Sequence, residues 1–415
     1  IGKELMGLAY RDCDATRDAA DIQRIWEEIG WIEPGREGVG EAVVSAYRGL
    51  VAELDGHVES FAFRSPGVVH HLGEPIPFCG IMAVGTSHVA RKQGFAARLT
   101  SAAVARGAEE GAMVAGLGMF EQGFYDRLGF GTGAREIYES FSPADLRIDT
   151  VPRKPVRLGA DDFEALHRAR LGRMKQHGAV SFDNPQMTRL GLLEQRDGYG
   201  LGYRDRSGEI THAMWLHAER REHGPLEVRW MAYREYSQMM ELLALLKALG
   251  DQFYTVRMQE PRGIQLQDLI PQPFSTHRAR EGGKHETDCG AVAWWQMRIC
   301  DLEGCLARTH LLNGTARFNL VLEDPIERRL DENEKWRGIS GEYTVTLGPE
   351  SRAVLGTDVK LPTLRATVNV FTRLWLGVRP ATGLAVTDRL EGPPGLLDEL
   401  DRVLCLQQPT TDWGF

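Results

Sequence analysis

The sequence predicts an α+β protein with two similar units, each a mixed sheet flanked by helices, and a third unit of α/β type. Strand and helix patterns alternate up to about residue 145 and again from 161 to 258. Proline-containing stretches at 150–156 and 261–273 are typical of linkers. From residue 292 onward the order of strands and helices changes. We expect three domains, at 1–149, 150–285 and 286–415.

The first region begins with an amphipathic pattern and then alternates. Apolar residues at helical spacing predict a helix over 18–29, and the Asp55-Gly56 turn predicts a hairpin within 51–63. The remaining expected elements are a strand over 76–86, a helix over 94–110, a strand over 112–118, a short helix over 120–125 and a final strand over 135–141.

The second region repeats the signature of strand, long helix and strand, which indicates a diverged duplication. Its expected elements are a helix over 161–174, strands over 200–204, 210–218 and 226–233, a helix over 237–249 and a strand over 253–258. The third region predicts strands over 316–323, 341–347 and 363–369 and helices over 370–376 and 394–404, with Trp294-Trp295 as a core or interface element.

Length and charge limit the classes of protein that the chain can represent. Its 415 residues can bury a sizeable core. The 49 basic and 58 acidic residues leave a net charge of −9, which argues against binding to nucleic acid, because that needs a basic face. No apolar run approaches the roughly 18 residues of a membrane span, and residues 1–5 show no signal-peptide core. We expect a cytoplasmic protein that uses no membrane.

The six cysteines are sparse and predict reduced thiols. Cys300 and Cys305 lie five positions apart without a second Cys or His pair nearby, unlike a zinc site. We therefore expect no metal.

One segment joins a strand to a helix in a way that favours an anion. Val84-Gly85-Thr86 ends an apolar strand, Arg91-Lys92-Gln93 follows, and Gly94 opens an amphipathic helix. Free backbone N–H groups at a helix start attract anions, and a glycine lets the backbone approach a phosphate closely. The segment predicts a phosphate-binding loop, although an ordinary turn with a solvated basic pair has the same pattern.

The spacing Arg91-x-x-Gly94-x-Ala96 resembles the pyrophosphate loop of the GCN5-related N-acetyltransferases. It lacks the Gly-Lys-Ser/Thr of a Walker loop and the Gly-x-Gly-x-x-Gly of a dinucleotide fold. The resemblance implies acetyl-CoA as the co-substrate. The residues that it implies for binding are Val84, Gly85, Thr86, Arg91, Lys92, Gln93, Gly94, Phe95, Ala96, Ala97, Phe120 and Glu121.

A second motif, Gln122-Gly-Phe-Tyr-Asp-Arg-Leu-Gly-Phe-Gly131, follows one helix and one strand later. It is similar to the segment of these enzymes in which a Tyr lies near the sulfur of coenzyme A, which implies that role for Tyr125. A tyrosine has a pKa near 10, so it is protonated at neutral pH and can donate a proton to a leaving thiolate. A packed core aromatic is the alternative interpretation.

The order of the three units, this motif and Leu374–Ala381 resemble the Eis (enhanced intracellular survival) family over nearly the whole chain. The resemblance implies tandem acetyltransferase folds, a C-terminal sterol-carrier-protein-like domain and a homohexamer. It also implies that the C-terminal tail enters the active site, where the α-carboxylate of Phe415 acts as general base for a primary amine. A frayed terminus is the alternative, against which the aromatic Trp413 and Phe415 argue.

The first helical region contains the candidate acceptor pocket. In the Eis family this region lines the amine pocket, which implies Trp26, Glu27, Glu28 and Trp31. Acidic groups attract an ammonium group and aromatic faces add cation–π attraction, but an amphipathic helix with a solvated acidic face explains them equally well. The candidate acceptors are small molecules with an amine, such as an aminoglycoside, a polyamine or a lysine-like compound.

The second unit lacks the phosphate loop. Only Arg234-Glu235-Tyr236 separates its strand from its long helix, with no glycine at the turn. We expect an acetyltransferase fold without coenzyme A binding. Two other functions stay open for the whole chain, a lipid or sterol carrier and an acyl-CoA-binding regulator without turnover.

Overall fold

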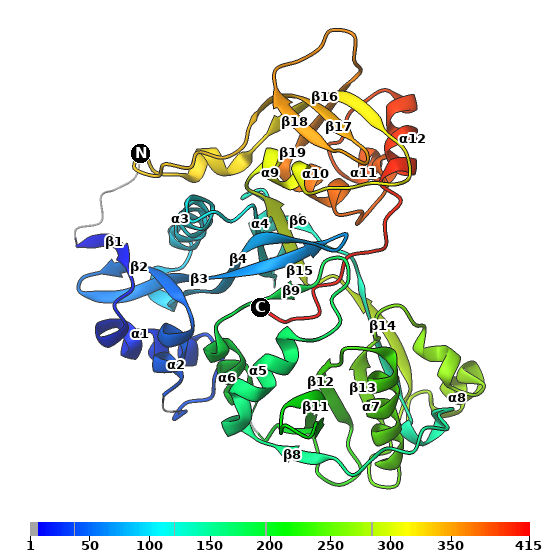
Figure 1. Cartoon of the computed structure of the whole chain (residues 1–415). Coiled ribbons are helices and arrows are strands. Elements are labelled where there is room, and N and C mark those ends of the chain that lie inside the picture. Colours follow the sequence, from blue (N-terminus) through cyan, green and yellow to red (C-terminus); the bar gives the residue numbers. More distant parts are fainter. Residues whose placement is uncertain (1–6, 37, 120, 196, 284) are drawn as a thin grey trace. The chain divides into compact units, whose positions relative to one another are not determined.

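The computed structural model describes residues 7–36, 38–119, 121–195, 197–283 and 285–415. The chain folds into two compact units (Figure 1). Unit 1 comprises Ile1–Ala134, Gln176–Asp183 and Trp294–Phe415, and unit 2 comprises Arg135–Lys175 and Asn184–Ala293. The division into three consecutive domains stays a prediction.

The large sheet of unit 1 has the strand order β1-β2-β3-β4-β5-β15-β6, and β9 pairs with β3. Its strands are β1 (Leu8–Asp12), β2 (Arg48–Leu54), β3 (His57–His71), β4 (Glu74–Thr86), β5 (Val114–Gly118), β6 (Gly131–Thr132), β9 (Val180–Ser181) and β15 (Trp295–Ile299). The β2–β3 hairpin turns through Asp55 and Gly56, both with positive φ, as the sequence predicts. Neighbouring strands are antiparallel except β4 and β5.

Helices cover both faces of this sheet, with α3 on one face and α1 and α2 on the other (Figure 1). The helices of this part of unit 1 are α1 (Ala15–Glu28), α2 (Val39–Ala46), η1 (His88–Ala90), α3 (Phe95–Glu109) and α4 (Gln122–Asp126). Asp14 caps α1 by accepting hydrogen bonds from the backbone N–H groups of Thr16 and Arg17, as N-cap residues do. The apolar face of α3, with Phe95, Leu99 and Ala103, packs in the core of unit 1.

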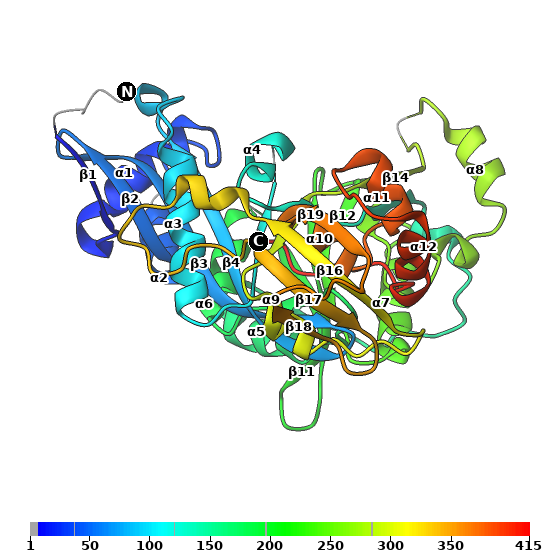
Figure 2. The same cartoon turned by 90° about the horizontal axis from the view of Figure 1, so that it is seen from above.

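Unit 1 also contains a four-stranded sheet of order β18-β17-β16-β19, seen from above in Figure 2. Its strands are β16 (Ala316–Glu323), β17 (Gly341–Leu347), β18 (Arg352–Leu355) and β19 (Thr363–Thr367). Its helices are α9 (Leu302–Ala307), η5 (Pro325–Arg329), α10 (Val368–Trp375), α11 (Ala381–Thr387) and α12 (Pro394–Val403). The α/β composition expected for this region is confirmed.

Unit 2 is built on a sheet of order β14-β7-β13-β12-β11-β10-β8. Its strands are β7 (Glu136–Phe141), β8 (Val156–Leu158), β10 (Tyr199–Arg204), β11 (Ile210–Ala218), β12 (Leu226–Ala232), β13 (Val256–Gln259) and β14 (Asp288–Val292). Its helices are η2 (Pro143–Asp145), η3 (Ala160–Asp162), α5 (Phe163–Leu171), α6 (Pro185–Glu194), α7 (Tyr236–Ala248), η4 (Leu266–Leu269) and α8 (Pro273–Arg280). Leucines of α7 pack on this sheet and form its core.

Two strands lie in a different sheet from the one that sequence order indicates. The strand expected at 135–141 to complete the first sheet is β7, which pairs with β13 and β14 in unit 2. Conversely, Trp295 of the expected third region is buried in β15, which lies between β5 and β6 in unit 1. The prediction for 135–141 was therefore right about the strand and wrong about its sheet.

Helices long and apolar enough to cross a bilayer are absent from the part of the chain that the structure describes.

Candidate active site

Strands β4 and β5 are parallel neighbours that separate before both end. Their pairing runs from Phe78 with Val114 to Ile81 with Leu117. Directly after Ile81, β4 has one more residue than β3 between consecutive pairs, which is a β-bulge. Because a bulge bends its strand, it accounts for the opening between β4 and β5. Beyond it, the described pairs of β4 are with β3 alone, so one strand edge faces the opening.

The predicted phosphate loop lies at the end of β4. It runs from Ser87 through η1 to Gly94, where α3 begins. Gln93 donates a side-chain hydrogen bond to the Val89 carbonyl over 3.1 Å, which holds the loop together, while Arg91 and Lys92 are exposed. The basic side chains are thus available beside the helix start.

Gly94 leaves room for a ligand at the first turn of α3. It has φ +88°, which disfavours residues with a Cβ, and no heavy atom lies within 4 Å of the position that a Cβ would take. Ala96 and Ala97 follow in the same turn with small side chains. An unobstructed helix start beside two basic residues fits a pyrophosphate.

Tyr125 lies in α4, the five-residue helix that follows β5. Its side chain is buried in the core cluster that also contains Phe95, Leu99 and Leu117. Burial raises the pKa of Tyr125 to about 12, so the hydroxyl keeps its proton at neutral pH. The core packing agrees with both interpretations of this residue, a structural aromatic and a proton donor.

The C-terminal tail is docked along unit 1. The Thr410 N–H donates to the His177 carbonyl over 3.2 Å, and the Val180 N–H donates to the Thr411 carbonyl over 2.9 Å. Trp413 is buried and its ring lies 6.0 Å from that of Phe182. These contacts hold the tail against the segment that carries β9, which pairs with β3.

The terminal residue ends at the carboxyl end of β5. The Phe415 ring packs against those of Phe78, Phe182 and Trp294, with centroid distances of 5.6, 5.8 and 6.0 Å. A Cβ built on Gly118 would overlap a terminal oxygen of Phe415. Since Gly118 is the last residue of β5 and α4 begins at Gln122, the terminal carboxylate and the Tyr125 helix adjoin the same strand end.

The acceptor candidates lie at or just beyond the last turn of α1. Trp26 and the half-exposed Trp31 meet edge to face at 5.3 Å. Glu28 accepts a hydrogen bond from the His88 backbone N–H and lies 3.2 Å from the His88 Nδ1, so it contacts the start of η1 in the predicted phosphate loop. Glu27 accepts a hydrogen bond from Gln23 over 2.8 Å. The two glutamates are thus engaged in local contacts.

Of the remaining predicted residues, Glu121 is the N-cap of α4, and Phe120 lies outside the described residues. Gly118, Gln296 and Arg298 were not predicted from the sequence. Gly118 lies against Phe415, Gln296 donates a hydrogen bond to Asp126, and Arg298 donates one to the Leu128 carbonyl. Each contact joins residues far apart in the chain, so no local sequence pattern marks them.

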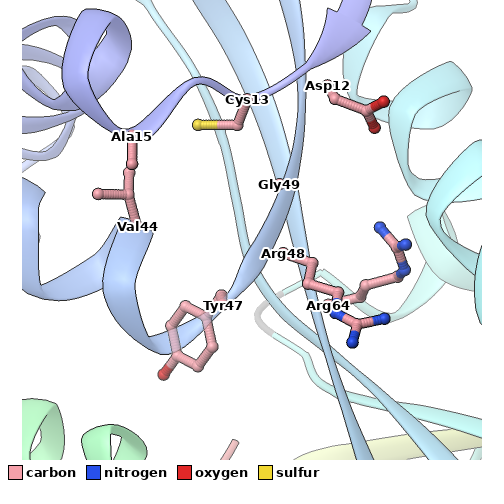
Figure 3. Close-up of a pocket in the computed structure, with 8 residues that line it drawn as sticks. All are labelled: Asp12, Cys13, Ala15, Val44, Tyr47, Arg48, Gly49 and Arg64. Carbon is pink, nitrogen blue, oxygen red and sulfur yellow. The ribbon is translucent and has the colours of Figure 1, made fainter.

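A separate pocket of about 330 Å³ lies where β1 ends and β2 begins (Figure 3). It is lined by Asp12, Cys13, Ala15, Val44, Tyr47, Arg48, Gly49 and Arg64. Arg48 and Arg64 already share Glu110, at 3.0 and 2.5 Å. Burial and the nearby Asp18 raise the pKa of the Cys13 thiol to about 12, which leaves it unreactive. The pocket includes no residue of the phosphate loop.

Groups of three or more His, Cys, Asp or Glu side chains that could hold a metal ion are not found within the described ranges.

Comparisons with known proteins identify the fold. No protein-family model matches the chain, and no curated protein matches it in sequence. Among solved structures, it is similar to a probable N-acyltransferase from Enterococcus faecalis, with a TM-score of 0.78 and 17% identity over 98% of this chain and 100% of that one. A GCN5-related N-acetyltransferase from Kribbella flavida has a TM-score of 0.73 and 18% identity over 100% of both chains.

Eis1 from Mycobacterium abscessus is similar over 98% of this chain and 100% of its own, with a TM-score of 0.73 and 16% identity. These likenesses confirm, at the level of the fold, the resemblance that the sequence motifs indicate. The chain has the fold of the GCN5-related N-acetyltransferases, shared with Eis1, over nearly its whole length.

Proposed function

We propose that this protein transfers the acetyl group of acetyl-CoA to a primary amine of a small cationic molecule. The observation that carries the proposal is the opening between β4 and β5, with an unobstructed helix start at Gly94 on one side and a terminal oxygen of Phe415 against Gly118 on the other. The opening and a candidate base thus adjoin the same pair of strands.

Under this proposal, different parts of unit 1 bind the pyrophosphate and the pantetheine chain of acetyl-CoA. The pyrophosphate is held by backbone N–H groups from Gln93 to Ala97, supported by Arg91 and Lys92. The pantetheine chain pairs with the open edge of β4 at Val84 to Thr86, as an added strand would. Glu121, the N-cap of α4, completes the site after β5, and the resemblance adds Phe120 to the binding residues.

The reaction needs two proton movements. A neutral amine attacks the thioester carbon, so a C–N bond forms and the C–S bond breaks. The Phe415 carboxylate takes the proton from the amine, through water, and Tyr125 donates its hydroxyl proton toward the departing sulfur. The high pKa of Tyr125 keeps it protonated but makes it a weak acid, so hydrogen bonding to sulfur in the transition state matters more than full transfer. The base role requires Phe415 to end the natural chain.

The acceptor is a cationic amine, such as an aminoglycoside, a polyamine or a lysine-like compound. Trp26 and Trp31 offer aromatic faces, and Glu27 and Glu28 offer negative charge at the same helix end. Because the amine acceptor is not identified, a panel of amines is the direct test.

Three finer features also belong to the proposal. The C-terminal α/β region has a sterol-carrier-like fold, and it positions the C-terminal tail in the active site. The protein assembles as a homo-oligomer, a hexamer by resemblance, which light scattering tests. It works in the cytoplasm, in accord with six free cysteines, and cell fractionation tests this.

The deciding experiment is a thiol-release assay with acetyl-CoA against the amine panel. We expect release of coenzyme A that depends on at least one cationic amine, with a matching mass increase of one acetyl group on that amine. Tight binding of acetyl-CoA without release would instead support the acyl-CoA-binding regulator. Extraction of lipid without acetyl-CoA binding would support the carrier.

A further inference from the structure

Strand β15 supplies two polar side chains to the core of the catalytic sheet. Gln296 and Arg298 are two residues apart and therefore point to the same face of the strand. Both are fully buried. Burying polar groups is costly unless they are hydrogen-bonded, so their partners indicate what they do.

Gln296 holds the end of the helix that contains Tyr125. Its Nε2 donates to Asp126 Oδ1 over 2.7 Å and to Thr132 Oγ1 over 3.1 Å. Asp126 is the last residue of α4 and follows Tyr125 directly, whereas Thr132 belongs to β6. One buried amide therefore links α4 to the strand that follows it.

Arg298 holds the turn after the same helix. Its Nη1 donates to the Leu128 carbonyl and its Nη2 to Asp324 Oδ2, both over 2.5 Å, and neither charged side chain is exposed. A Cβ on Gly129 would lie 2.8 Å from the same Nη1, so the turn fits closely around the guanidinium. The Leu128 N–H in turn donates to the Tyr125 carbonyl over 2.9 Å.

A helix as short as α4 is not stable in isolation, so its orientation depends on contacts such as these. We propose that Gln296 and Arg298 are positioning residues that fix the Tyr125 ring in the active site. The inference rests on the proposed role of Tyr125 and adds that a strand following unit 2 in the sequence makes that role possible. Displacing a catalytic group by about 1 Å can lower a rate on the order of 100-fold.

The first test is Gln296→Met, which keeps the length of the side chain, adds no charge and removes both donated hydrogen bonds. We expect kcat to fall about 10- to 100-fold. The Kd for acetyl-CoA should stay within about twofold, because the two hydrogen bonds that Gln296 donates go to Asp126 and Thr132, which lie outside the phosphate loop. In a Tyr125→Phe background the same exchange should change kcat little, because the hydroxyl it positions is gone. Equal losses in both backgrounds would overturn the inference.

Arg298→Lys is the second variant. It keeps a positive charge beside Asp324 but cannot reproduce both hydrogen bonds of the guanidinium, to the Leu128 carbonyl and to Asp324. Its matched control is Arg11→Lys, since Arg11 binds the buried Asp18 through two hydrogen bonds of 2.6 and 2.8 Å elsewhere in unit 1. We expect kcat to fall in Arg298→Lys and to stay unchanged in Arg11→Lys, when both are assayed at a temperature at which thermal unfolding shows each to be fully folded. Equal kcat in the two variants would contradict the inference.

A readout without turnover separates this inference from the proposed function. In protein labelled with 3-fluorotyrosine, the ¹⁹F resonance missing from Tyr125→Phe belongs to Tyr125. We expect Gln296→Met and Arg298→Lys to shift or broaden that resonance, and Arg11→Lys to leave it in place. Full activity of Tyr125→Phe would remove the proton-donor role, whereas an unmoved resonance in both test variants would remove the positioning role.

Discussion

The two large sheets share a strand order but differ at the turn that leads to their long helix. In unit 1 the parallel pair is β4 with β5, and in unit 2 it is β12 with β13. Each pairing stops where the earlier strand of the pair carries a bulge, after Ile81 in β4 and after Val228 in β12. Both sheets therefore have the features that open the parallel pair.

The turns beyond the bulges are unlike. Unit 1 uses Ser87 to Gly94, with a glycine of positive φ in open space at the helix start. Unit 2 reaches α7 through Tyr233, Arg234 and Glu235, and the N-cap position is held by the extended Glu235. A carboxylate there competes with any phosphate for the helix start. The sheet geometry can thus persist while the turn decides whether an anion binds.

The largest expected effect is a difference in kcat between variants of two buried tyrosines, Tyr125 in unit 1 and Tyr203 in unit 2. Burial raises the pKa of each to about 12. Tyr125→Phe should lower kcat by about 10²- to 10⁴-fold, the usual contribution of a proton donor, with the Kd for acetyl-CoA unchanged. Tyr203→Phe, which loses a 3.2 Å hydrogen bond to the Arg153 carbonyl, should keep full kcat. Steady-state kinetics on one good amine measures both variants. Similar kcat values for the two would contradict a catalytic role that belongs to Tyr125 and not to Tyr203.

The next effect concerns the C-terminal tail, which belongs to unit 1. Adding two residues after Phe415 moves the carboxylate from Gly118 and should lower kcat about 100-fold. Gly118→Ala should have a similar effect, because the new Cβ overlaps the terminal oxygen. Gly414→Ala is the control, since no heavy atom lies within 4 Å of its Cβ position. Full kcat in the extended protein would show that the terminal carboxylate is not the base.

Local signals in the sequence predicted much of unit 1 around the site. The Asp55-Gly56 turn, the apolar face of α3 and the glycine before it depend on neighbours a few residues away, and the structure has each of them. The region with the turn Arg234-Glu235 likewise folds as a sheet and helix without a glycine at that position. Such features follow from backbone conformation and periodicity, which a single sequence displays.

The exchange of β7 and β15 between sheets could not be predicted in this way. Trp295–Ile299 is buried along its whole length, yet it contains Gln296 and Arg298, so its hydropathy does not resemble a core strand. Its partners in β5 and α4 lie about 170 residues earlier, as the separation of Gln296 from Asp126 shows. Pairing over such a separation is decided by packing, and no local pattern encodes it.

A smaller effect tests the turns directly. Gly94→Glu places a bulky negative side chain where the pyrophosphate is proposed to bind and should weaken acetyl-CoA binding on the order of 100-fold, at about 1.4 kcal/mol for each factor of ten. Gly111→Glu is the matched control, because Gly111 follows the other end of α3, has φ +100° and also has no heavy atom within 4 Å of its Cβ position. Calorimetry should give one site per chain. A second site that survives Gly94→Glu would show that unit 2 binds coenzyme A.

The smallest effect compares two buried histidines, His71 in unit 1 and His212 in unit 2. His71 stacks on Trp375 at 4.2 Å, and neither of its ring nitrogens has a hydrogen-bond partner in the described structure. His212 lies 3.1 Å from Glu241 Oε2, which favours its charged form. Burial, with the nearby His177, holds the pKa of His71 well below its ordinary value of 6.5.

Because the unfolded chain protonates His71 near pH 6.5 while the folded chain does not, stability falls as the pH drops below that value. The loss approaches about 1.4 kcal/mol per pH unit until the folded pKa is reached, and nothing is lost above pH 7.5. His71→Phe replaces the imidazole with an aromatic ring that cannot be protonated and should flatten the pH dependence of thermal unfolding between pH 7.5 and 5.5, whereas His212→Phe should flatten it less, since Glu241 partly offsets burial. Equal slopes in the parent protein and His71→Phe would mean that another group dominates acid unfolding.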